Sequence, residues 1–269
     1  MRGGGGPRLL GCVPAARVDA AVGRACATDS TGRAGGASDE RGVFITFEGG
    51  DGSGKSTHVR FLSQFLEKHG VEVVCLREPG GTSIGEDLRQ VVLSPRNTEM
   101  SPECELLVYE AARAQLVSQV IRPALLRGAV VICDRFYDST VAYQGYARGL
   151  SQDFIALCNG FACQGVAPDR TILLVTGGSA QTGLDRATER FGADRLELEG
   201  VDFHTKVNEG FLQLQRQHPE RIRMVHSSED RAETARGVFE QLADLFPCVA
   251  EVLETPQYFD AINRKYAVL

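Results

Sequence analysis

A glycine-rich run at residues 49–56 has the residue types and the spacing that bind a phosphate group. It reads Gly-Gly-Asp-Gly-Ser-Gly-Lys-Ser and matches the pattern G-x(4)-G-K-[ST], in which backbone N–H groups surround a phosphate at the N-terminus of a helix. Lys55 would contact the β- and γ-phosphates, and the Ser56 hydroxyl would bind Mg²⁺. A buried-strand pattern at 43–48 precedes the run, and apolar residues at helical spacing follow it. A glycine-rich turn without a ligand is the alternative, but this context favours a nucleoside triphosphate site.

A second pair of residues, Asp134 and Arg135, follows the apolar run at 129–134. An aspartate at the end of such a strand can hold Mg²⁺ or its waters, and the adjacent arginine suits a site that holds two phosphates together. The chain has no N-K-x-D motif for reading guanine and no apolar run that ends in Asp-Glu. These features favour a small-molecule kinase over a switch GTPase or an ATPase motor.

The elements that position these residues alternate along the chain. We predict strands at 43–48, 71–76, 129–134, 171–176 and 221–226, because these short runs are apolar. Helical patterns cover 82–93, 101–127 with a bend at Pro123, 138–147, 151–164 and 201–217, and a last helix starts at Asp230 and ends before Pro247. Strands separated by helices predict an α/β fold with a doubly wound, parallel, five-stranded sheet flanked by helices.

Composition excludes several classes of protein. The chain has 269 residues and a net charge of −6, which argues against a nucleic-acid coat or a basic membrane-surface protein. No apolar run approaches the ~18 residues of a membrane span. The eight cysteines form no CxxC pair, so we expect reduced thiols and a cytoplasmic location, with Cys75 and Cys133 as small buried side chains.

Three segments are expected. Gly and Ala supply 17 of the first 38 residues, so residues 1–40 are predicted to be a disordered extension. A transit peptide, or a start codon placed too far upstream, would look the same. Residues 41–246 are the predicted catalytic domain, and 247–269 are read as a C-terminal tail.

Five motifs, the first of which contains the phosphate loop, give the chain a specific resemblance. The runs 48–56, 77–82 (Arg-Glu-Pro-Gly-Gly-Thr), 111–115 (Ala-Ala-Arg-Ala-Gln) and 134–145 (Asp-Arg-Phe-Tyr-Asp-Ser-Thr-Val-Ala-Tyr-Gln-Gly) resemble the bacterial thymidylate kinase family in order and spacing, as does Phe203-His204 with the residues that follow. The resemblance covers about 43–246. It implies the P-loop NTPase fold with a small helical lid at about 183–198, and the reaction ATP + dTMP → ADP + dTDP with Mg²⁺.

The resemblance also implies roles for individual residues. Lys55, Arg135 and Asp51 are the expected catalytic residues of the core, and Ser56 and Asp134 the expected metal ligands. Asp51 could instead be a turn-favouring residue. ATP would be bound by the residues of the phosphate loop: Gly49, Gly50, Asp51, Gly52, Ser53, Gly54, Lys55, Ser56 and Thr57.

For the dTMP pocket, the resemblance implies a ring that stacks on the base at Tyr109 and a hydrogen bond from Arg113 to a thymine carbonyl. Tyr109 could instead be a core aromatic, and Arg113 an exposed arginine. The remaining expected dTMP contacts are Glu78, Pro79, Arg89, Arg135, Thr140, Tyr143 and Gln144. The Glu78-Pro79 bond could be cis or trans.

The phosphate loop has Gly52 where one class of the family has an arginine, so the resemblance implies that the predicted lid supplies the positive charge instead. Its candidate catalytic arginines are Arg186, Arg190 and Arg195, although such a charged stretch can also be only a solvated face. Gly177-Gly178 departs from the usual Asp or Asn of the family, so a strand-end side chain that would hold the base of the lid is missing. Two alternative functions stay open: a kinase for another nucleoside monophosphate, and a nucleotide-binding protein with impaired turnover. A homodimer is implied by resemblance only, and neither a nucleic acid nor a membrane is expected as a partner.

Overall fold

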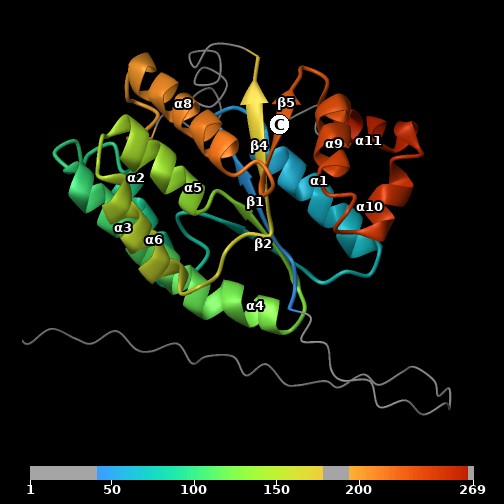
Figure 1. Cartoon of the computed structure of the whole chain (residues 1–269), viewed down its shortest axis with the longest axis horizontal. Helices are drawn as coiled ribbons and strands as arrows, with labels where there is room; N and C mark the ends of the chain where they lie inside the picture. Colours follow the sequence, from blue (N-terminus) through green and yellow to red (C-terminus); the bar gives the residue numbers. More distant parts are fainter. Residues whose placement is uncertain (1–40, 178–193, 266–269) are drawn as a thin grey trace, which may run out of the picture. The chain divides into compact units, whose positions relative to one another are not determined.

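The computed structural model describes residues 41–177 and 194–265. Its centre is a parallel five-stranded sheet with the strand order β2-β3-β1-β4-β5 (Figure 1). The prediction of an α/β fold with a doubly wound parallel sheet is confirmed. The predictions for 1–40, for the greater part of the lid, including Arg186 and Arg190, and for Gly178 lie outside the described residues.

The carboxyl ends of the five parallel strands lie at one edge of the sheet, together with the loops that follow them. The bounds are β1 Phe44–Glu48, β2 Val73–Arg77, β3 Val130–Asp134, β4 Arg170–Thr176 and β5 Ile222–Ser227. Phe47 pairs with Asp134 on one side and with Ile172 on the other. Because all five strands run in parallel, the glycine-rich loop after β1 and Asp134-Arg135 after β3 emerge side by side.

One face of the sheet is covered by α1 Lys55–Lys68, α9 Arg231–Glu240, α10 Pro247–Val252 and α11 Asp260–Lys265 (Figure 1). The segment after Phe246, expected as an appended tail, is part of this layer as far as it is described. Phe259 and Ile262 are fully buried, and the Phe259 ring lies 5.1 Å from that of Phe239. The two helices of six residues are too short to show a helical period, so the sequence pattern missed them.

The other face carries α2 Ser83–Leu93, α3 Pro102–Leu116, α4 Arg122–Leu126, α5 Tyr137–Thr140, α6 Gln152–Cys163 and α8 Val201–Gln217. The helix expected at 101–127 is interrupted by a π-helical turn at Val117–Ile121. This turn ends just before Pro123, whose ring nitrogen cannot donate to the helix. A second π-helical segment, Val141–Ala147, continues α5.

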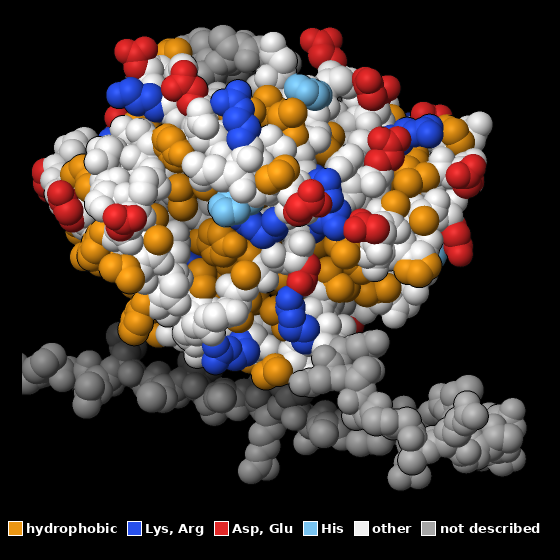
Figure 2. Space-filling model, in the orientation of Figure 1, with side chains coloured by type: hydrophobic (Ala, Val, Ile, Leu, Met, Phe, Trp, Pro, Cys, Tyr) orange, Lys and Arg blue, Asp and Glu red, His pale blue; other side chains and the backbone are white. Residues whose placement is uncertain are grey.

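The thiols and the outer helices show two further features. All six described cysteines are free; Cys133 is buried as expected, but Cys75 is exposed because β2 is an edge strand. On α6, Phe154, Leu157 and Phe161 are 51%, 71% and 85% exposed. Figure 2 shows hydrophobic side chains along the edge where α3 and α6 lie. No helix of the described part is long and apolar enough to cross a bilayer.

Candidate active site

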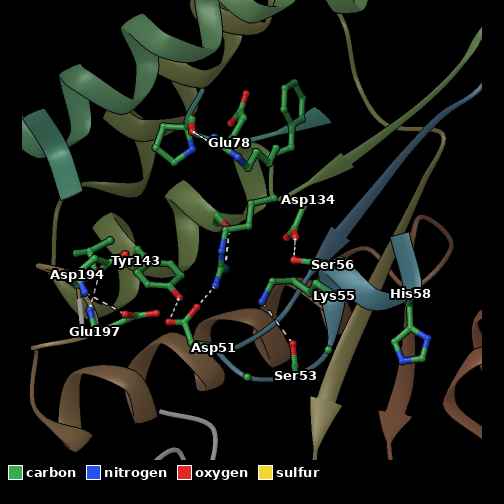
Figure 3. A pocket seen from close by; sticks show the side chains of 18 of the residues that line it. Asp51, Ser53, Lys55, Ser56, His58, Glu78, Asp134, Tyr143, Asp194 and Glu197 are labelled. Carbon is green, nitrogen blue, oxygen red and sulfur yellow. Dashed lines mark hydrogen bonds and ion pairs between the residues drawn. The ribbon is translucent and has the colours of Figure 1, made fainter. Parts of the chain in front are cut away.

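A cavity of about 1260 Å³ lies at the carboxyl edge of the sheet (Figure 3). Its walls come from the loops after β1, β2 and β3, from α3, α5 and the π-helical segment 141–147, and from residues 194–197. In open parallel sheets, this edge is where ligands bind. The cavity brings the phosphate loop and the predicted monophosphate pocket into one space.

The phosphate loop has a backbone that requires glycine at two positions. Gly54, directly before α1, has φ +92°. Gly49 has φ +134°, and a Cβ there would lie 2.2 Å from the carbonyl oxygen of Leu174. Side chains are therefore excluded by backbone conformation at Gly54 and also by close approach at Gly49. This conformation leaves the N-terminus of α1 facing the cavity, which is the arrangement that binds phosphate.

Lys55 is buried beneath this loop. Its Nζ donates to the carbonyl oxygens of Gly49, at 3.0 Å, and Gly50, at 2.8 Å. Burial and, second, the charge of the neighbouring Arg135 together lower the pKa of Lys55 to about 8. The phosphate loop therefore holds the Lys55 ammonium group in place.

Ser56 and Asp134 form the expected oxygen pair. The Ser56 hydroxyl donates to Asp134 Oδ2 at 2.6 Å, from the first turn of α1 to the end of β3 (Figure 3). A hydroxyl and a carboxylate fit Mg²⁺, which prefers oxygen ligands and completes its shell with water and phosphate oxygens. The donor set therefore suits a nucleotide-bound Mg²⁺.

Arg135 is held in the cavity from several sides. Its φ of +70° is in the left-handed region, which is uncommon for a side chain other than glycine. The guanidinium donates to the Gly49 carbonyl at 3.0 Å and forms an ion pair with Asp51. The Tyr143 hydroxyl donates to the other oxygen of Asp51 at 3.2 Å, and the Arg135 guanidinium lies over the Tyr143 ring at 5.2 Å. Burial alone would raise the pKa of Asp51, but Arg135 and Lys55 hold it below its usual range.

Glu48 supports the unusual backbone at Arg135. Its two carboxylate oxygens accept from the backbone N–H of Phe136, at 2.7 Å, and from the Ser139 hydroxyl, at 2.6 Å. Ser139 in turn accepts from the Arg135 guanidinium at 3.2 Å. Burial and, second, the nearby charge of Asp138 together raise the pKa of Glu48 to about 8.

Arg113 lies at the centre of a buried network, not on an exposed face. It is 1% exposed. Its Nη2 pairs with Glu78 at 2.7 Å, and its Nη1 donates to Glu110 at 2.7 Å, to Thr140 at 2.9 Å and to Asn159 at 3.0 Å. Burial raises the pKa of Glu78 to about 7, although Arg113 opposes the rise.

Nearly all of the predicted site residues outside the lid line the cavity. The predicted residues that line it are Asp51, Gly52, Ser53, Gly54, Lys55, Ser56, Thr57, Glu78, Pro79, Arg89, Tyr109, Arg113, Asp134, Arg135, Thr140, Tyr143 and Gln144. Gly49 and Gly50 lie behind Lys55 and accept its hydrogen bonds. The Glu78-Pro79 bond, which the sequence left open, is cis. Arg89 donates to the carbonyl oxygen of Pro79 at 3.0 Å.

Comparisons with known proteins agree with this geometry. The family model described as thymidylate kinase matches residues 47–237. The chain belongs to the thymidylate kinase family. It is 47% identical over 181 residues to a thymidylate kinase of Exiguobacterium sp., and the match covers 67% of this chain and 84% of that protein. It is 44% identical over 210 residues to that of Pseudomonas putida, with 78% and 97% covered.

A crystal structure of the thymidylate kinase from Ehrlichia chaffeensis has the same fold. The TM-score is 0.61 at 31% identity, and the match covers 75% of this chain and 98% of that one. This chain is thus an enzyme, a thymidylate kinase that phosphorylates dTMP. The reading that favoured a small-molecule kinase over GTPases and motors is confirmed.

Arg195, one of the three candidate catalytic arginines, is not a free cation in the cavity of this thymidylate kinase. It is buried, and its Nη2 pairs with Glu105 at 2.6 Å, while its Nε donates to the carbonyl oxygen of Val92 at 2.9 Å. It is not among the residues that line the cavity. Gly177, which directly follows β4, is exposed.

Sequence reasoning missed four buried polar residues that contact the cavity-lining residues of this thymidylate kinase. They are Glu48, Glu105, Asn159 and His204, none of which had a predicted role. His204 Nε2 lies 3.0 Å from the carbonyl oxygen of Leu196, and its Nδ1 lies 4.0 Å from Asp51. Two signals were available: Glu48 directly precedes the phosphate loop, and Glu105 lies one helical turn before Tyr109 on the same face.

Proposed function

We propose that this thymidylate kinase transfers the γ-phosphoryl group of ATP to dTMP within the single cavity described above. The observation that carries the proposal is the meeting of two sets of groups there. Lys55, Ser56 and Asp134 line it on the phosphate-loop side, and Tyr109 and Arg113 line it from α3. A transfer between two nucleotides needs both substrates in one water-excluding space.

In the proposed reaction, an oxygen of the dTMP phosphate attacks the γ-phosphorus of ATP, and the bond to the β,γ-bridging oxygen breaks. The attacking oxygen is already anionic near neutral pH, since the second pKa of a phosphate ester is ~6. No general base is needed. The protein must hold two repelling phosphates in line and place positive charge around the group in transit.

The cations for this task are Lys55 and Arg135. We assign Lys55 to the β- and γ-phosphates, because the phosphate loop fixes its Nζ next to the N-terminus of α1. Arg135 is assigned to the acceptor and transferred phosphates, with Asp51 and Tyr143 holding its guanidinium in place. Fixed cations stabilise the transition state without reorganisation during transfer.

We assign Mg²⁺ to Ser56 and Asp134. When bound with ATP, the ion neutralises charge on the β- and γ-phosphate oxygens. The role of the two residues is to present the hydroxyl and the carboxylate oxygens on the same side of the phosphate loop, where they lie 2.6 Å apart.

The thymine base is assigned to the space beside Tyr109 and Arg113. Tyr109 supplies a ring for stacking, and the second N–H of Arg113 Nη2 is the donor that we assign to a thymine carbonyl. Gln144 and Thr140, also at this wall, are buried polar groups at 1% exposure. We assign the Tyr143 ring to the 2′ position of the sugar, where crowding by the ring favours deoxyribose.

The transition-state cation of the predicted lid is assigned to Arg190 or, second, Arg186. Both are assigned from the sequence resemblance alone. Arg195 is the weaker candidate because Glu105 already neutralises it in a buried pair. An arginine of this kind contributes about 10³–10⁵ in kcat in related phosphoryl transfers.

We also propose a homodimer that acts in the cytoplasm. The exposed Phe154, Leu157 and Phe161 form one stripe on α6, and a second copy of the chain is the partner that we assign to it. Free thiols suit a reducing compartment. Neither a nucleic acid nor a membrane has a role in this proposal.

The test is a panel of acceptors in an assay that couples ADP release to a colour change. We expect dTMP to be used better than dUMP, by at most about 1–3 kcal/mol, because the two differ by one methyl group. UMP should be used least, because it also carries the 2′ hydroxyl that the Tyr143 ring is proposed to exclude. A preference for UMP would assign the chain to another nucleoside monophosphate. ADP release that no acceptor stimulates would indicate impaired transfer.

A further inference from the structure

A buried glutamate with no role in the chemistry, Glu105, joins three parts of the molecule. It is 0% exposed and lies in the first turns of α3. Its Oε2 accepts from Arg195 at 2.6 Å and from Arg148 at 2.9 Å, and its Oε1 accepts from Gln144 at 2.8 Å. Burial tends to raise the pKa of Glu105, but hydrogen bonds from Arg148 and Gln144 hold it below the usual value. The carboxylate is therefore charged at neutral pH.

The segment 194–199 is fastened through these arginines. Arg195 donates from its backbone N–H to the Leu93 carbonyl at 3.0 Å, in addition to its pair with Glu105. Arg148 bridges from Glu105 to Glu199, whose carboxylate lies 2.6 Å from it. Within the segment, Asp194 Oδ1 accepts from the backbone N–H of Leu196 and of Glu197, each at 2.9 Å. The segment is a tight turn held at both ends by one buried carboxylate.

This turn is a wall of the substrate cavity. Asp194, Leu196 and Glu197 line it together with Tyr109, which lies one turn beyond Glu105 on α3. Figure 3 shows Asp194 and Glu197 beside the Tyr143 ring. Glu105 is not among the residues that line the cavity, and its links to this wall are the ion pairs with Arg195 and, through Arg148, with Glu199.

We propose that Glu105 is a positioning residue that holds residues 194–199 as the wall of the acceptor side of the cavity, and that it thereby sets the affinity for dTMP. The inference rests on the assignment of dTMP to this side in the proposed function.

The first experiment uses Glu105→Gln, which keeps the size of the side chain and removes its charge. We expect the KM for dTMP to rise about tenfold, with the KM for ATP within twofold of wild type. Glu103→Gln is the matched control, because Glu103 is on the same helix but exposed, and its KM values should not change. Equal rises in both KM values, or an unchanged KM for dTMP in a folded variant, would overturn the proposal.

The second experiment tests the anchor itself. Arg195→Met should also raise the KM for dTMP, and the double variant Glu105→Gln/Arg195→Met should raise it by less than the product of the two single effects, because both single variants break the Glu105–Arg195 pair. Hydrogen exchange of a peptide that contains residues 194–199 should be at least about tenfold faster in each variant. Unchanged exchange, or KM effects that multiply in the double variant, would contradict the anchor.

A third variant separates this inference from the assignment of the acceptor side. Tyr109→Leu removes the proposed stacking ring and leaves the bonds of Glu105 in place. If Tyr109→Leu raises the KM for dTMP but Glu105→Gln does not, the role of Glu105 is wrong and the acceptor side stands. If neither variant raises it, both proposals fail.

Discussion

Replacing Arg113 by methionine should destabilise the protein strongly, because two buried carboxylates depend on this one cation. The side chains of Glu78 and Glu110 are 4% and 7% exposed, and both pair with Arg113 at 2.7 Å. Methionine keeps much of the volume and removes the charge. Removal of one partner from a buried ion pair costs about 3–5 kcal/mol. We expect a loss of that size in the free energy of unfolding at pH 8.

The loss should depend on pH in a defined direction. The pKa of Glu78 is already raised to about 7 with Arg113 present, and it rises further without the cation. A carboxyl group with a raised folded-state pKa destabilises the fold when it is ionised, and this destabilisation shrinks as the pH falls through that pKa toward the lower pKa of the unfolded chain. The penalty of Arg113→Met should therefore shrink by at least about 1 kcal/mol between pH 8 and pH 5.5, since one pH unit corresponds to about 1.4 kcal/mol.

Urea unfolding of wild type and variant at both pH values measures the effect. Arg127→Met is the matched control, because Arg127 pairs with Glu72 at 2.8 Å on the surface, where both side chains are about half exposed. Its cost should stay below about 1 kcal/mol at both pH values. If Arg113→Met costs less than about 1 kcal/mol, or if its cost is the same at pH 8 and pH 5.5, the electrostatic reading of this network is wrong.

Four further outcomes are expected. Lys55→Ala should lower kcat more than tenfold, a loss above about 1.4 kcal/mol, while circular dichroism shows an intact fold; a smaller loss would contradict its role at the phosphates. In the free enzyme the pKa of Lys55 is about 8, so the charge is present below that pH, and the Kd for ATP should rise up to about tenfold between pH 7 and pH 9 by calorimetry; a flat profile in that range argues against it. Ser56→Ala should raise the Mg²⁺ concentration for half-maximal rate several-fold, and chelation of Mg²⁺ should stop the wild-type reaction; an unchanged Mg²⁺ requirement would remove Ser56 from the metal site. Arg190→Ala, compared with Arg186→Ala, should lower kcat at least about 100-fold at saturating substrates with little change in ATP affinity; near-normal kcat in both variants would refute the lid assignment.

The sequence by itself determined the strands, most of the helices and the residues of the phosphate site. Strand and helix patterns arise from neighbouring residues, and the helix predicted at 201–217 has the bounds Val201–Gln217 in the structure. The phosphate loop is likewise local, because its glycines and Lys55 act within eight consecutive positions. Asp134 and Arg135 were found because they end a buried strand, and in a parallel sheet such ends meet at one edge.

Only the tertiary structure decided which charges neutralise one another. Arg113 meets Glu78 and Asn159, which are 35 and 46 positions away, and Glu105 meets Arg195 at a distance of 90 positions. No local period encodes such pairs, so an arginine in a charged stretch looks the same whether it is exposed, catalytic or buried. The helices after Phe246 were hidden for a related reason: their order comes from packing Phe259 against Phe239 and Phe61, not from their own short patterns.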